Sequence, residues 1–259
     1  MPREMKIGRV FLVGAGPGPA DLLTLRAART IENAEALLYD ALVSDEVLAM
    51  APRACLRIQT GKRAGRASMA QETITKLMLR LARRGLKVVR LKGGDPSIFG
   101  RVGEEVEALR RHGIEAEVIP GVTAACAAAA QFGFPLTHRG EARELVFATA
   151  RTQDGAVRLD GDAARAASAT LALYMGRDSM AALSAGLIEA GRAPSTPALA
   201  VENAGSPTAR LFSGDLASLP ALLEAAAPEG PVLIVVGEVA ARAEVGSVVE
   251  EVQVAALWA

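Results

Sequence analysis

Histidine, cysteine and aromatic residues are all scarce in this chain of 259 residues. It has two histidines, two cysteines and 3% aromatic residues. Cys55 and Cys126 have no metal-ligand spacing, and His112 and His138 are too few and too far apart for a histidine metal site. We therefore expect no metal ion, and we expect the two cysteines to be buried free thiols in a reducing compartment.

The chain also lacks net charge and long apolar runs. The 29 basic residues balance the 29 acidic ones, so no global electrostatic footprint for nucleic acid exists. The longest apolar stretches, such as A-A-C-A-A-A-A, are too short to span a membrane, and the N-terminus has no signal-peptide core. With 51% hydrophobic residues, the sequence predicts a soluble, cytoplasmic protein without nucleic-acid or membrane partners.

Short apolar runs alternate with amphipathic segments, which predicts two α/β domains with mostly parallel or mixed sheets flanked by helices. The expected strands are residues 9–13, 36–40, 55–60, 86–91, 115–119, 145–150, 170–175, 197–202, 209–213 and 231–236. The expected helices are near 21–34, 44–50, 68–84, 102–112, 123–131, 177–190 and 215–226. The turn-rich stretch Q-F-G-F-P-L-T-H-R-G lies between the halves, so we place the domains at 1–136 and 137–259.

The helix expected over residues 68–84 has the clearest local signals. Ser68 and Gln71 match a capping box, and Gly85 matches a helix stop. Its apolar face consists of Ile74, Leu77, Met78 and Leu81.

The first glycine-rich stretch, V-F-L-V-G-A-G-P-G-P-A-D, resembles a dinucleotide-binding turn. The G-x-G-x-x-G fingerprint fits Gly14 and Gly16, but Pro19 occupies the third glycine position. Pro17 and Pro19 also remove backbone N–H donors that a diphosphate would need. The sequence therefore disfavours an NAD-type oxidoreductase.

Two further glycine turns follow predicted strands. In V-V-R-L-K-G-G-D-P, Gly93 and Gly94 allow a ligand to approach the backbone, and Asp95 suits a cationic, zwitterionic ligand. In V-I-P-G-V-T-A-A, Thr123 can cap the helix of small residues that follows. Three such turns at strand ends predict one ligand pocket.

These motifs resemble the tetrapyrrole methyltransferases that use S-adenosylmethionine, over nearly the whole chain. V-G-A-G-P-G-P-A-D-L-L-T-L-R-A is similar to the first signature of that family, and V-V-R-L-K-G-G-D-P-S-I-F-G to the second. Further similar stretches are G-K-R at 61–63, F-G-R-V-G-E-E at 99–105, P-L-T-H-R at 135–139 and Y-M-G at 174–176. G-K-R and T-H-R resemble the branch of the family that methylates uroporphyrinogen III.

The resemblance implies an active site in the cleft between two α/β domains, usually in a homodimer. The implied reaction transfers methyl groups from S-adenosylmethionine to C2 and C7 of uroporphyrinogen III. The products are precorrin-2, used in sirohaem and cobalamin synthesis, and S-adenosylhomocysteine. The second domain would complete the S-adenosylmethionine site.

Residue roles follow from the same resemblance. A ring carbon that attacks a methyl group becomes cationic, and the ring must then lose a proton. The resemblance makes Asp40 the proton acceptor and Lys62 the proton donor, although these could also be a turn cap and a surface lysine. The implied cofactor contacts are Pro17, Gly93, Gly94, Asp95, Ile98, Thr123, Ala124, Met175 and Ala204.

The implied substrate carries eight carboxylates, so a neutral protein must gather cations locally. Candidate substrate-binding residues are Arg63, Arg66 and His138. By resemblance, substrate binding or proton handling also involves Arg101, Glu104 and Arg139. Each arginine could instead be a solvated charge or salt-bridge partner, and Glu104 could complement a helix dipole.

The chain departs from the family pattern at a few positions. Ala150 and Arg151 replace a Gly-His pair, Val102 stands where a glycine is usual, and no glutamine precedes Arg210. One alternative is therefore a methyltransferase acting on a later precorrin. A non-catalytic tetrapyrrole-binding paralogue is the other, and it is disfavoured because the candidate proton acceptor and donor are retained.

Overall fold

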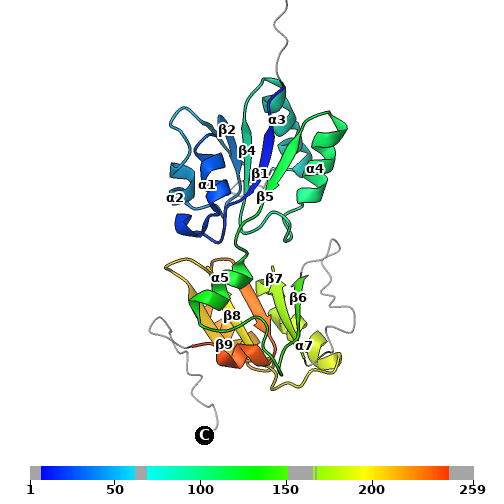
Figure 1. Cartoon of the computed structure of the whole chain (residues 1–259). Coiled ribbons are helices and arrows are strands. Elements are labelled where there is room, and N and C mark those ends of the chain that lie inside the picture. The colour runs from blue at the N-terminus through cyan, green and yellow to red at the C-terminus, as the bar shows by residue number, and fades with distance from the viewer. Residues whose placement is uncertain (1–6, 62–68, 151–165, 167, 245–259) are drawn as a thin grey trace, which may run out of the picture. The chain divides into compact units, whose positions relative to one another are not determined.

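The chain folds into two compact α/β units, which confirms the predicted fold class (Figure 1). The computed structural model describes residues 7–61, 69–150, 166 and 168–244. The units divide between Thr123 and Ala124. The division expected after residue 136 therefore lies inside the second unit, because the helix that begins at Ala124 packs in an apolar cluster with the second sheet.

The first unit contains a fully parallel five-stranded sheet in the order β3-β2-β4-β1-β5. Its strands are β1 (Val10–Gly14), β2 (Ala36–Tyr39), β3 (Leu56–Gln59), β4 (Val88–Lys92) and β5 (Ala116–Ile119). Every residue of β1 and β4 is buried, because helices cover both faces of a parallel sheet. All five strands lie within a few residues of their predicted positions.

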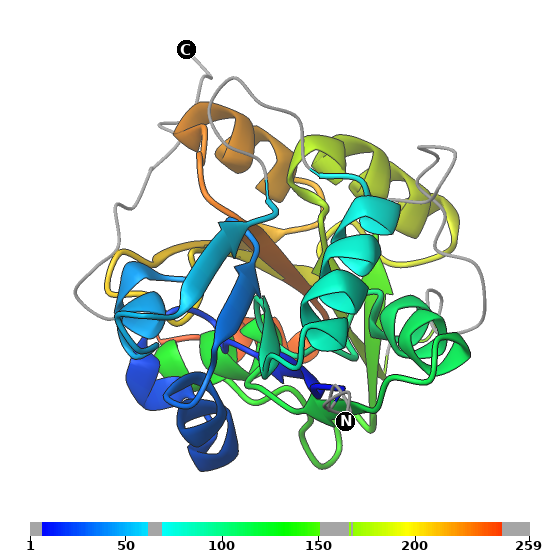
Figure 2. The ribbon, with the colours of Figure 1, turned by 90° about the horizontal axis from the view of Figure 1, so that it is seen from above.

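Two pairs of helices cover this sheet (Figures 1 and 2). On one face, α1 (Leu25–Ile31) and α2 (Asp45–Ala49) pack against Val13 and other residues of the sheet, and a short 3-10 turn, η1 (Ala20–Leu22), precedes α1. On the other face, α3 (Gln71–Arg83) and α4 (Val102–Arg111) pack against a cluster that includes Leu12. Consecutive residues of a strand, such as Leu12 and Val13, thus pack into apolar clusters on opposite faces of the sheet.

Helix α3 confirms its predicted apolar face and stop but not its predicted start. It begins at Gln71 after the N-cap Ala70, which makes no side-chain cap, so the capping-box prediction is wrong. Ser68 lies outside the described residues. The Gln71 side chain instead donates to Glu105 of α4 at 2.8 Å. The helix ends before Gly85, whose φ of +84° is in the left-handed region that favours glycine.

The second unit contains a mixed five-stranded sheet in the order β6-β7-β10-β8-β9. Its strands are β6 (Glu144–Thr149), β7 (Ala169–Tyr174), β8 (Pro197–Glu202), β9 (Arg210–Asp215) and β10 (Val232–Val236). Strands β6 and β7 pair in parallel, whereas the other three ladders are antiparallel. The strands again occupy their predicted positions.

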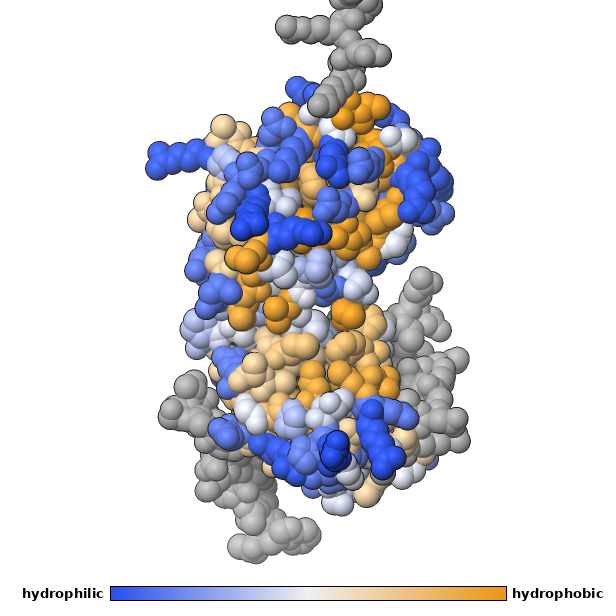
Figure 3. Space-filling model, in the orientation of Figure 1, coloured by the Kyte–Doolittle hydropathy of each residue, from blue (hydrophilic) through white to orange (hydrophobic). Residues whose placement is uncertain are grey.

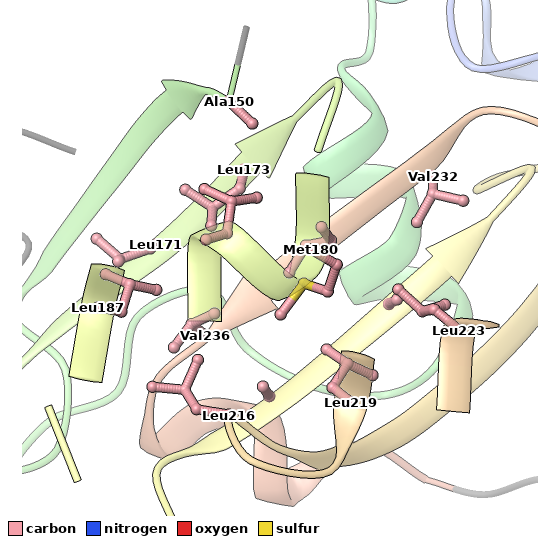
Figure 4. Close-up of a cluster of buried hydrophobic side chains, with 14 of the residues drawn as sticks. Ala150, Leu171, Leu173, Met180, Leu187, Leu216, Leu219, Leu223, Val232 and Val236 are labelled. Carbon is pink, nitrogen blue, oxygen red and sulfur yellow. The ribbon is translucent and has the colours of Figure 1, made fainter. Parts of the chain in front are cut away.

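Apolar clusters cover both faces of the second sheet. On one face, α7 (Met180–Glu189), preceded by the 3-10 turn η2 (Arg177–Ser179), and α8 (Leu219–Ala226) pack against the strands, as Figure 4 shows. On the other face lie α5 (Ala124–Gln131) and the 3-10 turn η3 (Glu238–Arg242).

Cys126 of α5 is exposed, which corrects the expectation that both cysteines are buried, while Cys55 is buried.

Three glycines allow backbones to touch at one edge of the first sheet. A Cβ atom on Gly14, at the end of β1, would lie 2.6 Å from the amide nitrogen of Gly121 and 2.8 Å from the carbonyl oxygen of Gly94. A Cβ atom on Gly121 would lie 2.4 Å from the same Gly94 oxygen. The loops that follow β1, β4 and β5 therefore pack backbone against backbone, with no room for a side chain.

We predict that Gly14→Ala lowers the free energy of unfolding by about 1–3 kcal/mol, because the added methyl group forces these backbones apart. The matched control is Gly103→Ala in α4, where an added Cβ meets nothing within 4 Å. The control should raise the free energy of unfolding by about 0.5–1 kcal/mol through helix propensity. Urea unfolding measures both, and equal effects at the two positions would contradict the packing argument.

Candidate functional site

Most of the predicted site residues of the first unit lie in the loops at one edge of its sheet. Because all five strands are parallel, the carboxyl ends of β1, β2, β4 and β5 meet at that edge, where ligands of open α/β sheets bind. The structure brings together there the loops that contain Pro17, Asp40, Gly93, Gly94, Asp95 and Ile98, with Thr123 at the end of the loop after β5.

The loops after β1 and β4 are joined through their backbones. Gly16 N donates to Gly94 O at 3.2 Å, and Gly94 N donates to Gly16 O at 2.7 Å. Both glycines have left-handed φ angles, +68° and +66°. Ala15 N adds a bond to Lys92 O at 2.8 Å. Pro17 therefore follows a loop whose position is fixed by β4.

The carboxylate of Asp40 ties the loop after β2 to the loop after β4. Its Oδ2 accepts a hydrogen bond from Gly93 N at 3.1 Å, and its Oδ1 accepts one from Leu42 N at 3.0 Å. Asp40 also lines a cavity of about 380 Å³ together with Tyr39, Asp45 and others. A carboxylate has about four lone-pair positions, so two accepted bonds leave capacity for a proton.

The carboxylate of Asp95 is occupied by donors of the protein itself. Its Oδ2 accepts from Gly121 N at 2.9 Å, which joins the loop after β4 to the loop after β5. Its Oδ1 accepts from Ser97 N at 2.8 Å and from the Ser97 hydroxyl. Asp95 thus orders the turn that contains Ile98, so its first role in this structure is to position backbone.

The first glycine loop is also held by helix α2, which the sequence analysis did not connect with the site. The Ser44 hydroxyl donates to Gly18 O at 2.6 Å, and Glu46 Oε2 accepts from Ala20 N at 3.1 Å. The S-D-E sequence at the start of α2 is typical of a helix N-terminus, and it is the only local pattern that draws attention to these residues. It predicts a cap, but no local pattern predicts that the same side chains reach the loop after β1.

Large apolar side chains are exposed beside these polar groups. Leu42 is 58% exposed next to Asp40, and Phe99 is 40% exposed in the turn before α4. Figure 3 shows hydrophobic residues among hydrophilic ones on the visible face of the first unit. Carboxylates with adjacent apolar surface suit a ligand that has an apolar body and polar substituents.

Arg101 and Glu104 pair with each other at the start of α4. Arg101 Nε and Nη2 donate to the two carboxylate oxygens of Glu104 at 2.8 and 2.6 Å. This hydrogen bonding raises the pKa of Arg101 and holds the pKa of Glu104 below its usual range. Phe99 and Arg101 have φ angles of +53° and +57°, a strain that clusters at functional sites.

Besides Ser68, four residues named by the sequence analysis lie outside the described residues: Lys62, Arg63, Arg66 and Arg151. The first three follow Gly61, which packs closely on the neighbour of Asp40. A Cβ on Gly61 would lie 2.3 Å from Ala41 N. Gly61, the last described residue before Lys62, thus lies beside the loop that contains Asp40.

The candidates of the second unit lie after strand ends and at the start of α5. Tyr174 OH accepts a hydrogen bond from Ala125 N at 3.3 Å, which brings the end of β7 to the residue after Ala124. Met175 follows with a φ of +59° and is 50% exposed. Ala204 is buried in the apolar cluster on which Ala124 and Tyr174 also pack. The structure therefore groups these three candidates within the second unit.

His138 and Arg139 lie in a tight turn. His138 N donates to Ala142 O, and Ala142 N donates to His138 O, both at 2.9 Å. His138 Nδ1 lies 3.0 Å from Arg139 O and 3.7 Å from Glu141 Oε1. The Arg139 side chain is exposed, so it is available to a ligand in solution.

Two positions that depart from the family pattern, and the residue that follows a third, have structural roles. Ala150 is 2% exposed in the core of the second unit, and Val102 is the first residue of α4 and packs on the core of the first. Arg210 Nε lies 2.6 Å from Glu202 Oε2. Burial opposes ionisation of Glu202, but hydrogen bonds from Arg210 and Gly230 N outweigh it and hold the pKa of Glu202 below its usual range.

Two features are absent from the part of the chain that the structure describes. In those ranges, no three His, Cys, Asp or Glu side chains are grouped so as to hold a metal ion. Nor do the helices placed there include one of the length and apolarity that a membrane crossing requires.

The parallel sheet, its four joined loops and a second mixed-sheet unit define a two-unit α/β protein whose candidate site lies at strand carboxyl ends. The family model of the tetrapyrrole (corrin/porphyrin) methylases matches residues 9–220. The chain belongs to this family.

Curated relatives and solved structures agree with this assignment. Siroheme synthases of Chromobacterium violaceum and Xylella fastidiosa are 46% and 48% identical over 239 and 237 residues, 92% of this chain in each case. Because the matches cover 51% and 50% of those proteins, the chain spans about half the length of the curated relatives it matches.

Among solved structures, the uroporphyrin-III C-methyltransferase of Thermus thermophilus, in complex with S-adenosylhomocysteine, is 41% identical with a TM-score of 0.75. The match covers 90% of this chain and 98% of that one. A cobalt precorrin-4 methyltransferase is 26% identical with a TM-score of 0.78, covering 88% of this chain and 94% of that one.

We predict that Asp95→Asn lowers the free energy of unfolding by about 1–3 kcal/mol, because an amide cannot accept all the bonds from Gly121 N and Ser97. The matched control is Asp21→Asn at an exposed position, which should stay within about 0.5 kcal/mol of the unmodified protein. Chemical denaturation measures both. No difference between the two variants would show that Asp95 does not hold the loops together.

Proposed function

We propose that the protein transfers methyl groups from S-adenosylmethionine to C2 and C7 of uroporphyrinogen III, giving precorrin-2 and S-adenosylhomocysteine. The observation that carries this proposal is the 41% identity to the Thermus thermophilus uroporphyrin-III C-methyltransferase over 98% of that chain. The similarity to half of each siroheme synthase adds support and points to sirohaem synthesis as one use of the product.

Methyl transfer from a sulfonium is an in-line displacement. The new bond forms between a pyrrole carbon and the methyl carbon while the carbon–sulfur bond breaks, and its electron pair remains on sulfur as a thioether. The ring becomes a cation of the iminium type and regains neutrality by losing a proton. Because the leaving group is good, the protein mainly has to align the two reactants and accept that proton.

We assign the proton acceptor to Asp40. Its two accepted hydrogen bonds come from the backbone N–H groups of Leu42 and Gly93, which fix the carboxylate without satisfying all its lone pairs. The cavity that it lines offers access from solvent. Lys62 is the proposed proton donor, on the resemblance alone.

The proposed cofactor site uses the loops after β1 and β4. Gly93 and Gly94 let the ligand approach the backbone, Asp95 fixes the turn that carries Ile98, and Pro17 follows the Gly16–Gly94 pair. The remaining proposed contacts are Thr123, Ala124, Met175 and Ala204. Met175 supplies an exposed thioether that suits contact with an adenine ring or a sulfonium.

The proposed substrate requires local positive charge because it carries eight carboxylates. Arg101 uses two of its five N–H donors on Glu104, so the others remain for a substrate carboxylate. Arg139 is exposed in its turn, next to His138. Lys62, Arg63 and Arg66 complete the proposed set of basic residues, with Glu104 placing the Arg101 guanidinium.

The second candidate substrate is a later precorrin, favoured by the fold match to the cobalt precorrin-4 methyltransferase. The lower identity of that match, 26% against 41%, makes it the weaker candidate. The two substrates can be supplied separately to the same preparation, so one assay decides between them.

The test is anaerobic incubation of the purified protein with S-adenosylmethionine and uroporphyrinogen III. Mass spectrometry should find a product heavier by two methyl groups and an equivalent amount of S-adenosylhomocysteine for each. Asp40→Asn should abolish the product while the protein still binds S-adenosylhomocysteine. Methylation of a later precorrin only would replace the substrate proposal, and methylation of neither would overturn the enzymatic one.

We predict that Arg139→Ala raises the KM for uroporphyrinogen III on the order of tenfold, because a guanidinium contact to a carboxylate is lost. The Kd for S-adenosylhomocysteine should change less than twofold. Arg143→Ala, at an exposed arginine four residues on, is the matched control and should leave both constants unchanged. An equal loss of affinity for both ligands would contradict separate roles.

We further propose, from the resemblance, that the protein is a cytoplasmic homodimer that binds no nucleic acid or membrane. The balanced charge of the sequence is consistent with this proposal. Analytical ultracentrifugation of the purified protein should give twice the mass of one chain, and a monomer at all concentrations would contradict it.

A further inference from the structure

The loop that carries Ala204 is tied to helix α5 by a side-chain amide. Gln131, the last residue of α5, donates from Nε2 to Ser206 O at 2.9 Å, and its Oε1 accepts a hydrogen bond from Gly205 N at 2.8 Å. Gly205 directly follows Ala204, which is one of the proposed cofactor contacts. The amide thus binds two consecutive residues of the backbone, one as donor and one as acceptor, which fixes the position and the orientation of this backbone.

The remaining hydrogen bonds of Gly205 and Ser206 lie within the loop itself. Ser206 N donates to Asn203 O at 2.9 Å, and Ala209 N donates to Ser206 O at 3.1 Å. These bonds shape the turn but do not attach it to another element. Where the structure describes the chain, the hydrogen bonds that join Gly205 and Ser206 to another helix or strand are the two made by Gln131.

The backbone on either side of Ala204 has an unusual conformation. Asn203 has a φ of +51° and Gly205 a φ of +86°, so both lie in the left-handed region. A residue other than glycine is strained there and keeps this conformation only where its surroundings fix it. Because Ala204 lies between the two, the conformation of the loop decides where the backbone of Ala204 lies.

Helix α5 connects this loop with a second proposed cofactor contact. Ala124 begins the helix and Gln131 ends it, and six of its eight residues are alanine, the strongest helix former. Ala125 and Ala128 of the helix lie in the same apolar cluster as Ala204. The helix is therefore a short rigid spacer, with a cofactor contact at one end and the residue that holds the loop at the other.

The two bonds of Gln131 contribute little to the stability of the whole unit. Gln131 is exposed, and so are both of its hydrogen bonds. Water can replace either bond when the side chain is removed, so the loss costs little free energy of unfolding. The main effect of the side chain is local, because it restricts the backbone next to Ala204.

We propose that Gln131 is a positioning residue of the cofactor site, which holds the backbone at Ala204 in the conformation that S-adenosylmethionine binds. Gln131 acts through Gly205 and Ser206. A loop that is ordered before binding spares the cofactor the entropy cost of ordering it, so the affinity is higher. The inference deepens the proposed function and rests on it, since it requires Ala204 to be a cofactor contact.

The test is the Kd for S-adenosylhomocysteine in two variants, measured by isothermal titration calorimetry. Gln131→Met has a side chain of similar length that makes neither bond. Gln131→Glu can still accept from Gly205 N, but its ionised carboxylate cannot donate to Ser206 O and is repelled by it. Each variant should raise the Kd by about threefold to tenfold, because the loop is then ordered only on binding.

Stability and kinetics separate positioning from a structural role. The melting temperature of both variants should stay within about 2 °C of the unmodified protein. The KM for S-adenosylmethionine should rise with the Kd, while kcat and the KM for uroporphyrinogen III stay unchanged. The matched control is Glu224→Met at an exposed position of α8, which should change neither the Kd nor the melting temperature.

The outcomes distinguish this inference from the proposed function. An unchanged Kd in both Gln131 variants, or a fall in melting temperature beyond that of Glu224→Met, would overturn the inference, while methyl transfer by the unmodified protein upholds the function. An unmodified protein that binds no S-adenosylhomocysteine and transfers no methyl group would overturn both. A higher Kd in the Gln131 variants alone, at unchanged melting temperature, supports the positioning role.

Discussion

The close contact of backbones at Gly14, Gly94 and Gly121 is the constraint on which the rest of the first unit's site depends. The Cβ positions of Gly14 and Gly121 fall within 3 Å of a neighbouring backbone atom, so the loops after β1, β4 and β5 can meet only where side chains are missing. The contact is reinforced by the Gly16–Gly94 pair and by Asp95. The backbone of the proposed site is thereby fixed by the sheet instead of by the loops themselves.

Carboxylates at strand ends combine a structural and a chemical role here. Asp40 and Asp95 each accept one backbone N–H bond from two residues on in their own loop and one from a neighbouring loop. The bond within the loop is the turn-capping function that a sequence alone suggests for such residues. The same bonds hold a carboxylate at a defined place. Asp40 also lines a cavity, so capping and the proposed proton transfer are compatible functions of one side chain.

The fold and the loops of the site could be predicted because they depend on local patterns. The apolar runs between amphipathic segments predicted the positions of the strands, and the glycine turns predicted the positions of the loops. Contacts between distant segments could not be predicted. Gln71 reaches Glu105 instead of capping its own helix, and α5 joins the second unit instead of the first. The alternation of Arg90 and Lys92 in a buried strand was a usable signal, but only the structure supplies Glu105 as their partner.

The loop after β1 has the shape of a dinucleotide-binding turn, but two of its N–H donors are engaged and two of its residues have no N–H group. The N–H groups of Ala15 and Gly16 bond to β4 and its loop, and Pro17 and Pro19 have none. A diphosphate needs free N–H groups at this position. The sulfonium of S-adenosylmethionine carries positive charge at its reacting atom, so carbonyl oxygens and carboxylates suit that part of the cofactor better than N–H donors do. The N–H groups of Ala15 and Gly16 join this loop to its neighbours and are not available to a diphosphate. This engagement, and not the number of glycines in the sequence, distinguishes the loop from a dinucleotide-binding turn.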